Sequence, residues 1–339
     1  MKALLIGGTG TISTEISKRL IKLGWELTLL NRGNTGAFVP EGARVIKVDV
    51  NDEAAVNALL GDERFDVIAD FIVFTPEQAQ RDIRLFRERT AQYIFISSAS
   101  AYQKPLATPV ITESTPLSNP YWQYSRNKIA IEELLMKEYR ESGFPITIVR
   151  PSHTYDERNV PVGAHGDKGS WQVLKRMMEG KPVLVQGDGT TLWTVTFNTD
   201  FAKAFIGLMG NIHAIGEAYH ITSDESVTWN QIYRIIADEL SVPFKPYYVP
   251  SDFLHAAGKY DYEGGLIGDK SNTVVFDNSK VKRAVPGFVS TVRADQGLRK
   301  TIRHMLATPE LQKDDPEFDA WCDKVIAAME KAKEDILNG

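Results

Sequence analysis

The sequence lacks several features that mark specialised classes of protein. It has one cysteine among 339 residues, Cys322, which excludes an intramolecular disulfide and a cysteine-based metal cluster. No apolar run is long enough to predict a transmembrane helix, and glycines break the first apolar run too early for a signal peptide. There is no excess of positive charge, because 39 lysines and arginines stand against 44 aspartates and glutamates.

What remains is the composition of an ordinary globular protein, with 43% hydrophobic and 24% charged residues. The net charge of −5 gives no general attraction to nucleic acid. The histidines and aspartates show no H-x-x-x-H spacing that would suggest a metal site. We therefore expect a cytoplasmic protein with no metal, no membrane partner and no nucleic-acid partner.

Short apolar runs alternate with helical patterns over the first 150 residues. The predicted strands are 2–8, 25–33, 43–50, 65–73, 91–100 and 144–152. The predicted helices are 13–24, 52–61, 76–90 and 126–143. Such alternation is typical of βαβ units. It predicts an α/β fold with a Rossmann-type, doubly wound parallel sheet in residues 1–150.

The regularity falls after this point. Residues 151–339 predict mainly a smaller C-terminal α/β lobe that binds substrate, with a segment at about 195–210 returning to the Rossmann domain. A lobe of this kind would cover the carboxyl ends of the strands, where ligands bind in α/β folds.

The segment IGGTGTIST joins the first predicted strand to the first predicted helix. Gly7, Gly10 and Ser13 are spaced G-x-x-G-x-x-S, which lets the backbone approach a pyrophosphate at the helix N-terminus. We predict a dinucleotide site here, with Thr11 and Ile12 beside the glycines. The alternative is a plain glycine turn in a flavodoxin-like sheet.

The ends of the next two strands bear on the choice of dinucleotide. Asn31 and Arg32 end the second strand without a carboxylate, which favours NADP over NAD. Arg32 could instead face solvent or stack on the adenine, which NAD would also allow. Asp49 and Val50 end the third strand, where they would meet the adenine, although Asp49 could equally serve as a carboxylate at a helix N-terminus.

A serine-rich strand end and a tyrosine–lysine pair follow. The segment IFISSASAY offers Ser98, with Ser97 and Ser100 as rivals, and QYSRNK places Tyr124 four residues before Lys128. On a helix these two side chains share one face and can reach the same pocket. Taken alone, Tyr124 would be interpreted as an ordinary residue of an amphipathic helix.

The glycine turn, the serine strand and the Tyr-x-x-x-Lys pair together resemble the short-chain dehydrogenase/reductase superfamily. The size and the lobe are similar to its extended branch, the NAD-dependent epimerase/dehydratase group, from residue 1 to about residue 300. The resemblance implies Tyr124 as general acid/base, Lys128 as the residue that holds the nicotinamide ribose and lowers the pKa of the phenol, and Ser98 as the group that polarises the substrate oxygen. It also implies a nicotinamide cofactor that carries the hydride, and a possible homodimer.

Further cofactor contacts are expected at Phe71 and after the sixth strand, in VRPSHTYDERN. Pro151, Ser152 and His153 would lie at the nicotinamide end, with a structural role for His153 as the alternative. Asp156-Glu157 replaces the Gly-Pro that the family usually has at this point.

The predicted lobe departs from the family in the segment GDGTTLWTV. Trp193 stands where members acting on nucleotide-diphosphate sugars often have an arginine for the pyrophosphate. An indole cannot replace that guanidinium, but it can stack on a sugar or simply pack under the lobe. The other candidate substrate contacts are Tyr121, Trp122, His165 and Trp171.

These features predict an NAD(P)-dependent oxidoreductase or epimerase of the short-chain dehydrogenase type. It would move a hydride between nicotinamide and a carbinol carbon of a small hydroxylated, sugar-like substrate. The sequence does not separate epimerase, dehydrogenase and dehydratase. The alternatives are a non-catalytic RNA-binding protein, because the sequence also resembles plastid stem-loop RNA-binding proteins, and a cofactor-sensing regulator. The acidic balance argues against RNA.

Overall fold

A computed structural model describes residues 1–33 and 38–339. Its centre is a seven-stranded sheet in the order β12-β7-β5-β4-β1-β2-β3, in which every neighbouring pair is parallel. The strands are β1 (Lys2–Ile6), β2 (Glu26–Asn31), β3 (Arg44–Lys47), β4 (Val67–Asp70), β5 (Tyr93–Ile96), β7 (Ile146–Pro151) and β12 (Ala218–Ile221). This confirms the predicted fold class.

Helices cover both faces of the sheet, as a doubly wound fold requires. They are α1 (Ser13–Lys22), α2 (Glu53–Leu60), α3 (Pro76–Phe86), α4 (Gln123–Ser142), α6 (Asn198–Leu208) and α9 (Ser279–Ala284). On one face, Ile16 of α1 packs in a core with Phe201 and Phe205 of α6. On the other face, residues of α2, α3 and α4 share a second core, among them Val56, Ile83 and Ile131.

Local sequence signals set the ends of the helices beside the site. Pro76 is the first residue of α3, where its missing N–H costs nothing. The Gln78 side chain accepts a hydrogen bond from the Thr75 backbone N–H at 3.2 Å, which completes a capping box. Gly143 ends α4 in the left-handed conformation, with φ of +69°. The predicted start of this helix at residue 126 was three residues late, so Tyr124 lies within its first turn.

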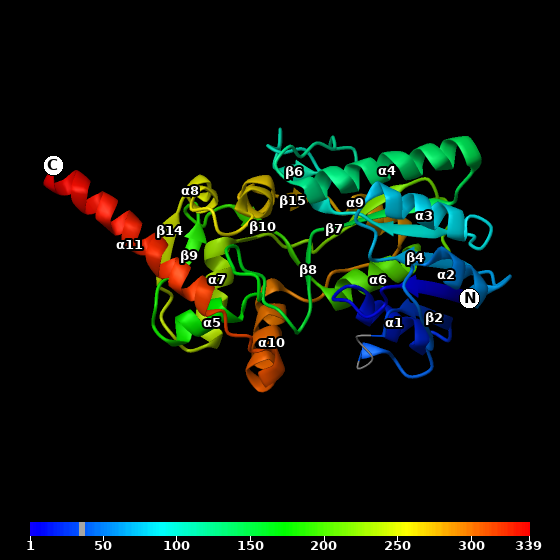
Figure 1. Ribbon diagram of the computed structural model, residues 1–339, viewed down its shortest axis with the longest axis horizontal. Helices are drawn as coiled ribbons and strands as arrows, with labels where there is room; N and C mark the ends of the chain where they lie inside the picture. Colours follow the sequence, from blue (N-terminus) through cyan, green and yellow to red (C-terminus); the bar gives the residue numbers. More distant parts are fainter. Residues whose placement is uncertain (34–37) are drawn as a thin grey trace.

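The sheet also uses residues beyond the first 150. Strand β12 pairs with β7, so the sheet has a seventh strand from residues that the sequence pattern assigned to the smaller lobe. Helix α6 lies beside α1, so the chain returns to the Rossmann sheet between residues 198 and 221 (Figure 1).

The remaining elements form the smaller lobe, which Figure 1 shows at the opposite end from the N-terminus. Its helices are α5 (Trp171–Met178), α7 (Trp229–Glu239), α8 (Ser251–Ala256), a π-helix (Glu263–Lys270), α10 (Ala294–Ala307) and α11 (Pro316–Asn338). The short strands of the lobe and of its junction with the sheet are β6 (Val110–Ile111), β8 (His153–Tyr155), β9 (Val183–Gln186), β10 (Leu192–Trp193), β11 (Val195–Phe197), β13 (Val227–Thr228), β14 (Pro246–Val249) and β15 (Val275–Phe276). The lobe has its own apolar core, which includes Trp193 and Trp229. Of the helices described, none has the length and apolar character needed to cross a membrane.

Candidate functional site

The glycine turn has the geometry that a close approach by phosphate needs. Gly7 adopts φ of +74°, and a Cβ built on it would lie 2.8 Å from Cγ2 of Ile72. Ser13, at the third position of the pattern, does more than stay small. Its Oγ accepts a hydrogen bond from the N–H of Gly10 at 2.8 Å and donates one to the carbonyl of Gly7 at 2.6 Å. The serine therefore holds the turn closed at the N-terminus of α1.

A cavity of about 440 Å³ opens from this turn across the carboxyl ends of β1, β2 and β3. The predicted cofactor residues that line it are Gly7, Gly10, Asn31, Arg32, Asp49 and Val50. Other lining residues are Thr9, Leu30, Gly33, Val48, Asn51, Ile72, Phe74, Gln78 and Arg81. The size of the cavity and the bare backbone at its glycine end fit the adenosine and phosphate part of a dinucleotide.

Thr11, Ile12 and Phe71, which were also predicted as cofactor contacts, do not line this cavity. Thr11 is exposed, and its carbonyl accepts a hydrogen bond from Asn198 at 3.2 Å. Ile12 packs against the core beneath α1. Phe71 turns into the same core and its ring lies 5.6 Å from that of Phe205. The direction of the Phe71 side chain has a local cause. The carboxylate of Asp70 accepts a hydrogen bond from the N–H of Ile72 at 2.7 Å and turns the chain after β4.

A buried charged cluster lies beside the cavity at the glycine turn. The guanidinium of Arg81 donates to Asn51 Oδ1 at 2.7 Å and pairs with the carboxylates of Asp82 at 2.6 Å and Asp70 at 3.2 Å. Burial raises the pKa of both carboxyl groups. Asp49 accepts hydrogen bonds from the backbone and the side chain of Asn51 at 3.0 and 2.9 Å. Sequence reasoning missed Arg81, because a charged residue in a charged helix gives no sign of being buried.

A second cavity, of about 250 Å³, contains the predicted catalytic serine and tyrosine. The predicted residues that line it are Ser98, Trp122, Tyr124, Pro151, Ser152, His153 and Trp193. The Ser98 hydroxyl lies close enough to the phenol of Tyr124 to act on it, and the Oγ atoms of Ser98 and Ser100 lie 2.8 Å apart. Ser97 is buried and donates to Glu132 at 2.5 Å, away from the cavity. Of the three serines, Ser98 is thus the one that contacts the tyrosine.

Lys128 lies behind this pair rather than in the cavity wall. Its Nζ donates to the carbonyls of Val73 at 2.6 Å and Ile96 at 2.7 Å and lies 5.5 Å from the ring centre of Tyr124. Burial lowers the pKa of Lys128 to about 7. Burial raises the pKa of Tyr124, and the hydrogen bond with Ser98 only partly opposes this. Burial therefore shifts the pKa of Tyr124 in the direction opposite to the lowering expected from Lys128, and that role of Lys128 stays a prediction.

The two cavities approach each other at a pair of aromatic rings. Phe74 lines the first cavity and Tyr124 the second, and their ring centres are 6.4 Å apart. A dinucleotide whose adenosine occupies the first cavity would extend towards the hydroxyl groups of the second. We therefore treat the two cavities as one candidate active site.

Trp193 and His153 form one wall of the catalytic cavity. Trp193 Nε1 donates to His153 Nδ1 at 3.2 Å, while its rings stack on Trp229 at 5.5 Å. Burial lowers the pKa of His153 to about 3, so its imidazole is neutral and Nδ1 can accept the hydrogen bond from the indole N–H. Trp193 is 3% exposed. It packs in the core of the lobe, as one interpretation of the sequence held, and it also lines the cavity, where stacking on a sugar stays a prediction.

Three predicted substrate contacts do not line the catalytic cavity. The indole of Trp171 lies in the core of the lobe, where its Nε1 donates to Asp314 at 3.2 Å. His165 Nδ1 lies 2.8 Å from the carbonyl of Gly166. Tyr121 packs beside the π-helix. The loop and helix patterns gave no direction for these side chains, and the packing of the lobe turns them away.

The cavity also contains Ser100, a rival of Ser98 in the sequence, and residues that the sequence gave no reason to choose: Ala99, Lys104, Asp269, Lys270, Val274 and Phe276. They come from the loop after β5 and from the π-helix and β15. About 165 residues separate these segments, so no spacing pattern could connect them.

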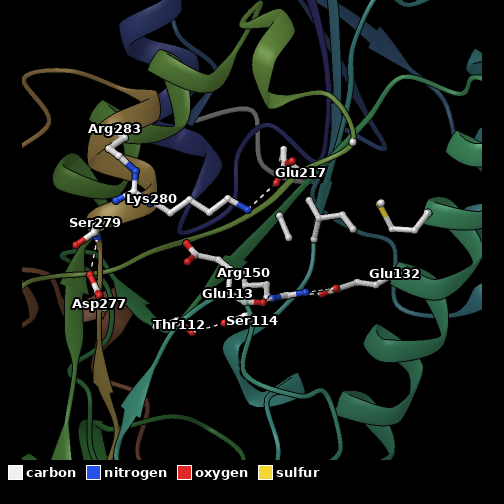
Figure 2. Close-up of a pocket in the computed structure, with 14 residues that line it drawn as sticks. Thr112, Glu113, Ser114, Glu132, Arg150, Glu217, Asp277, Ser279, Lys280 and Arg283 are labelled. Atoms are coloured by element: carbon white, nitrogen blue, oxygen red, sulfur yellow. Dashed lines mark hydrogen bonds and ion pairs between the residues drawn. The ribbon is translucent and has the colours of Figure 1, made fainter.

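The most voluminous cavity described, about 640 Å³, lies elsewhere, between α4, β7, β12 and α9 (Figure 2). Its charged groups largely pair with one another. Lys280 meets Glu217 at 2.7 Å, and Arg150 meets Glu132 at 2.6 Å. None of the predicted site residues lines it. Within residues 1–33 and 38–339, no group of three or more acidic, histidine or cysteine side chains is arranged to hold a metal ion.

The sequence and the fold are similar to those of known proteins. The sequence model of the NAD dependent epimerase/dehydratase family matches residues 3–222. The chain is 24% identical over 288 residues to 2'-dehydrokanamycin reductase of Streptomyces kanamyceticus, covering 85% of this chain and 80% of that protein. It is 26% identical over 267 residues to chloroplast stem-loop binding protein of 41 kDa b of Arabidopsis thaliana, covering 74% of this chain and 67% of that protein.

Among solved structures, UDP-glucose 4-epimerase of Thermus thermophilus in complex with NAD aligns with a TM-score of 0.71 and 19% identity, covering 91% of this chain and 100% of that chain. This likeness shows a common fold. Neither the family match nor this neighbour supports the predicted preference for NADP. The family match spans well over half of the sequence and confirms the resemblance drawn from the glycine turn, the serine strand and the tyrosine–lysine pair. The chain belongs to the NAD dependent epimerase/dehydratase family.

Proposed function

We propose that this protein is a nicotinamide-dependent oxidoreductase or epimerase that acts on a carbinol carbon of a small, sugar-like substrate. The observation that carries the proposal is that Ser98 and Tyr124 line one cavity, which adjoins the cavity at the glycine turn, with Ser98 close enough to act on the phenol. Buried Lys128 lies behind the tyrosine. These three side chains come from two elements, β5 with its following turn and α4.

The dinucleotide would be held by the residues of the first cavity. Gly7 and Gly10 would face the phosphates, Asn31 and Arg32 the adenosine ribose, and Asp49 with Val50 the adenine edge. A bound nicotinamide would supply the hydride chemistry at the substrate carbon. The family favours NAD, whereas exposed Arg32 is the residue that favours NADP.

The chain itself supplies the proton chemistry. Ser98 Oγ would donate a hydrogen bond to the substrate oxygen, while Tyr124 exchanges a proton with the same oxygen. Because burial raises the pKa of Tyr124, its phenol is protonated near neutral pH and is suited to give a proton. That state favours reduction of a ketone to an alcohol. Pro151, Ser152 and His153 would border the nicotinamide end of the cavity.

The substrate is expected to place a single ring in the catalytic cavity. About 250 Å³ is below the usual range of pockets for drug-sized ligands, roughly 300–1,000 Å³. Trp122 and Trp193 offer aromatic surface to a sugar face.

We further propose a homodimer that pairs through α3 and α4, which lie side by side on one face of the sheet (Figure 1).

The first experiment is to denature the purified protein and identify any nucleotide that is released. If none is released, NAD⁺ and NADP⁺ are titrated by calorimetry. Hydride transfer is then followed at 340 nm with a panel of monosaccharides and sugar nucleotides. Tyr124→Phe should lower the turnover rate by about 10²–10⁴-fold, the usual contribution of a general acid–base residue. Tyr139→Phe, on the same helix but outside both cavities, should leave it unchanged.

RNA binding is the second candidate, because the match to the stem-loop binding protein spans 74% of this chain. A protein that binds no dinucleotide but binds stem-loop RNA with an affinity that falls steeply with salt would replace the enzymatic proposal. Binding of NAD⁺ with loss of turnover in Tyr124→Phe would support the enzyme.

A further inference from the structure

The catalytic cavity contains a buried lysine that nothing in the family pattern singles out. Lys104 lies on the loop after β5, and its backbone N–H donates to the carbonyl of Ser118 at 2.7 Å. The residue is 3% exposed and lines the same cavity as Ser98 and Tyr124. Its side chain is therefore out of bulk water and faces the place where the substrate would react.

The ammonium of Lys104 has no partner among the residues that the structure describes: neither a hydrogen bond nor an ion pair within 4.0 Å reaches its Nζ. Lys128, which is equally buried, donates to two backbone carbonyls. Asp269 is close enough to act on the pKa of Lys104 but does not contact it. A buried ammonium without a partner is costly, so proteins rarely keep one without a ligand to meet it.

The other charges of the cavity do not compensate for Lys104. Lys270 and Asp269 lie 3.8 Å apart and largely balance each other, and Lys270 Nζ also donates to the carbonyl of Gly265 at 3.2 Å. His153 is neutral, because burial lowers its pKa to about 3. With Lys104 charged, the cavity carries one positive charge more than it carries negative charges.

We propose that Lys104 is a specificity-determining residue that binds an anionic group, a carboxylate or a phosphate, on the ring that reacts. The inference rests on the proposed function of the same site. Since one cavity of about 250 Å³ holds Ser98, Tyr124 and Lys104, the anion belongs to the reacting ring and not to a distant nucleotide. Lys270, from the π-helix, lines the same cavity, where it pairs with Asp269 at 3.8 Å.

The physical consequence is a ranking of substrates by charge. Burial lowers the pKa of Lys104, and an anion beside it would favour the ammonium again. A neutral sugar would leave the ammonium unpaired, and a sugar that carries an ammonium would be repelled by it. Asp269 would instead favour a sugar that carries an ammonium. The ranking therefore also tests whether Lys104 or Asp269 determines which sugar binds.

The test uses four matched probes: glucose, glucuronate, glucose 6-phosphate and glucosamine. Each is titrated into the intact protein saturated with its dinucleotide, by calorimetry and by tryptophan fluorescence, since Trp122 and Trp193 line the cavity. We expect glucuronate or glucose 6-phosphate to bind at least about tenfold more tightly than glucose, a factor that one charge-assisted hydrogen bond can supply. Which of the two binds more tightly distinguishes a carboxylate from a phosphate.

Lys104→Met keeps the length of the side chain and removes the charge. It should reduce the preference for the anionic probe to within about twofold of glucose, with the affinity for glucose and for the dinucleotide unchanged. Lys280→Met removes a lysine of the other large cavity (Figure 2) and should preserve the preference, which excludes binding of the anion there.

Tightest binding of glucosamine, equal binding of all probes, failure of every probe to bind, or a preference that survives Lys104→Met would each overturn the proposal. The proposed function fails separately, when no dinucleotide binds or when Tyr124→Phe leaves turnover intact. The melting temperature of Lys104→Met, measured with and without dinucleotide, separates lost binding from lost folding.

Discussion

Removing one partner of the buried ion pair between Arg150 and Glu132 should destabilise the protein more than removing one partner of an exposed pair. Arg150, at the end of β7, donates to both carboxylate oxygens of Glu132 on α4, at 2.9 and 2.6 Å. The side chains are 6% and 4% exposed. The same carboxylate accepts the hydroxyl of Ser97, and Arg150 also donates to Tyr102 at 3.2 Å. The pair thereby fixes the catalytic helix to the strand ends beside Ser98.

Arg150→Met removes the cation and keeps most of the apolar volume. It leaves the Glu132 carboxylate buried. Of the hydrogen bonds described above, only the one from Ser97 then still reaches this carboxylate. Breaking one side of a buried pair costs about 3–5 kcal/mol, because the other charge is left uncompensated. Replacing both residues, as Glu132→Leu with Arg150→Met, should cost less than half of the sum of the single changes.

The assay is urea unfolding followed by circular dichroism, with the four proteins of the double-mutant cycle compared at constant slope. Arg84→Met is the matched control, since Arg84 pairs with Glu53 at 2.5 Å on the surface, with 58% and 36% of the side chains exposed. It should cost at most about 1 kcal/mol. If Arg150→Met costs no more than Arg84→Met, or if the two single changes add, the reasoning from burial is wrong.

Three further predictions concern the cofactor, acid stability and the thiol. Arg32→Glu should weaken NADP⁺ binding at least about tenfold and leave NAD⁺ unaffected, as measured by calorimetry; equal affinity of the unchanged protein for both would refute the role of Arg32. Burial lowers the pKa of His153 to about 3, so the unfolded chain binds more protons between pH 3 and 6.5, and stability falls as the pH drops through that window. His153→Asn should therefore lose less stability than the unchanged protein between pH 7 and pH 5 in urea unfolding, and identical losses would contradict this. Burial raises the pKa of the Cys322 thiol to about 12, so a disulfide reagent at pH 8 should react only after denaturation, and rapid reaction of the native protein would show that the thiol is accessible.

Much of the fold followed from patterns within about twenty residues of each other. Strand and helix alternation predicted a parallel sheet, because a right-handed crossover helix is what joins two neighbouring parallel strands. The turn from Gly7 to Ser13 and the pair of Tyr124 and Lys128 also lie within short segments, whose spacing fixes the geometry through the turn and the helix. These local patterns also carried the assignment to the family.

The tertiary structure decided where individual side chains point and which distant segments meet. The sequence chose Phe71 as a cofactor contact, but the turn after Asp70 sends it into the core and places Phe74 at the cavity. Lys104 and Asp269 reach one cavity from segments far apart in the chain, and neither forms a pattern with its sequence neighbours. Periodicity shows which side chains share one face of a helix or strand. Which charged groups meet across a cavity depends instead on how the lobe packs on the sheet. The sequence by itself therefore determined the fold and located the proposed catalytic residues, and the packing of the two parts determined which charged side chains line the cavity.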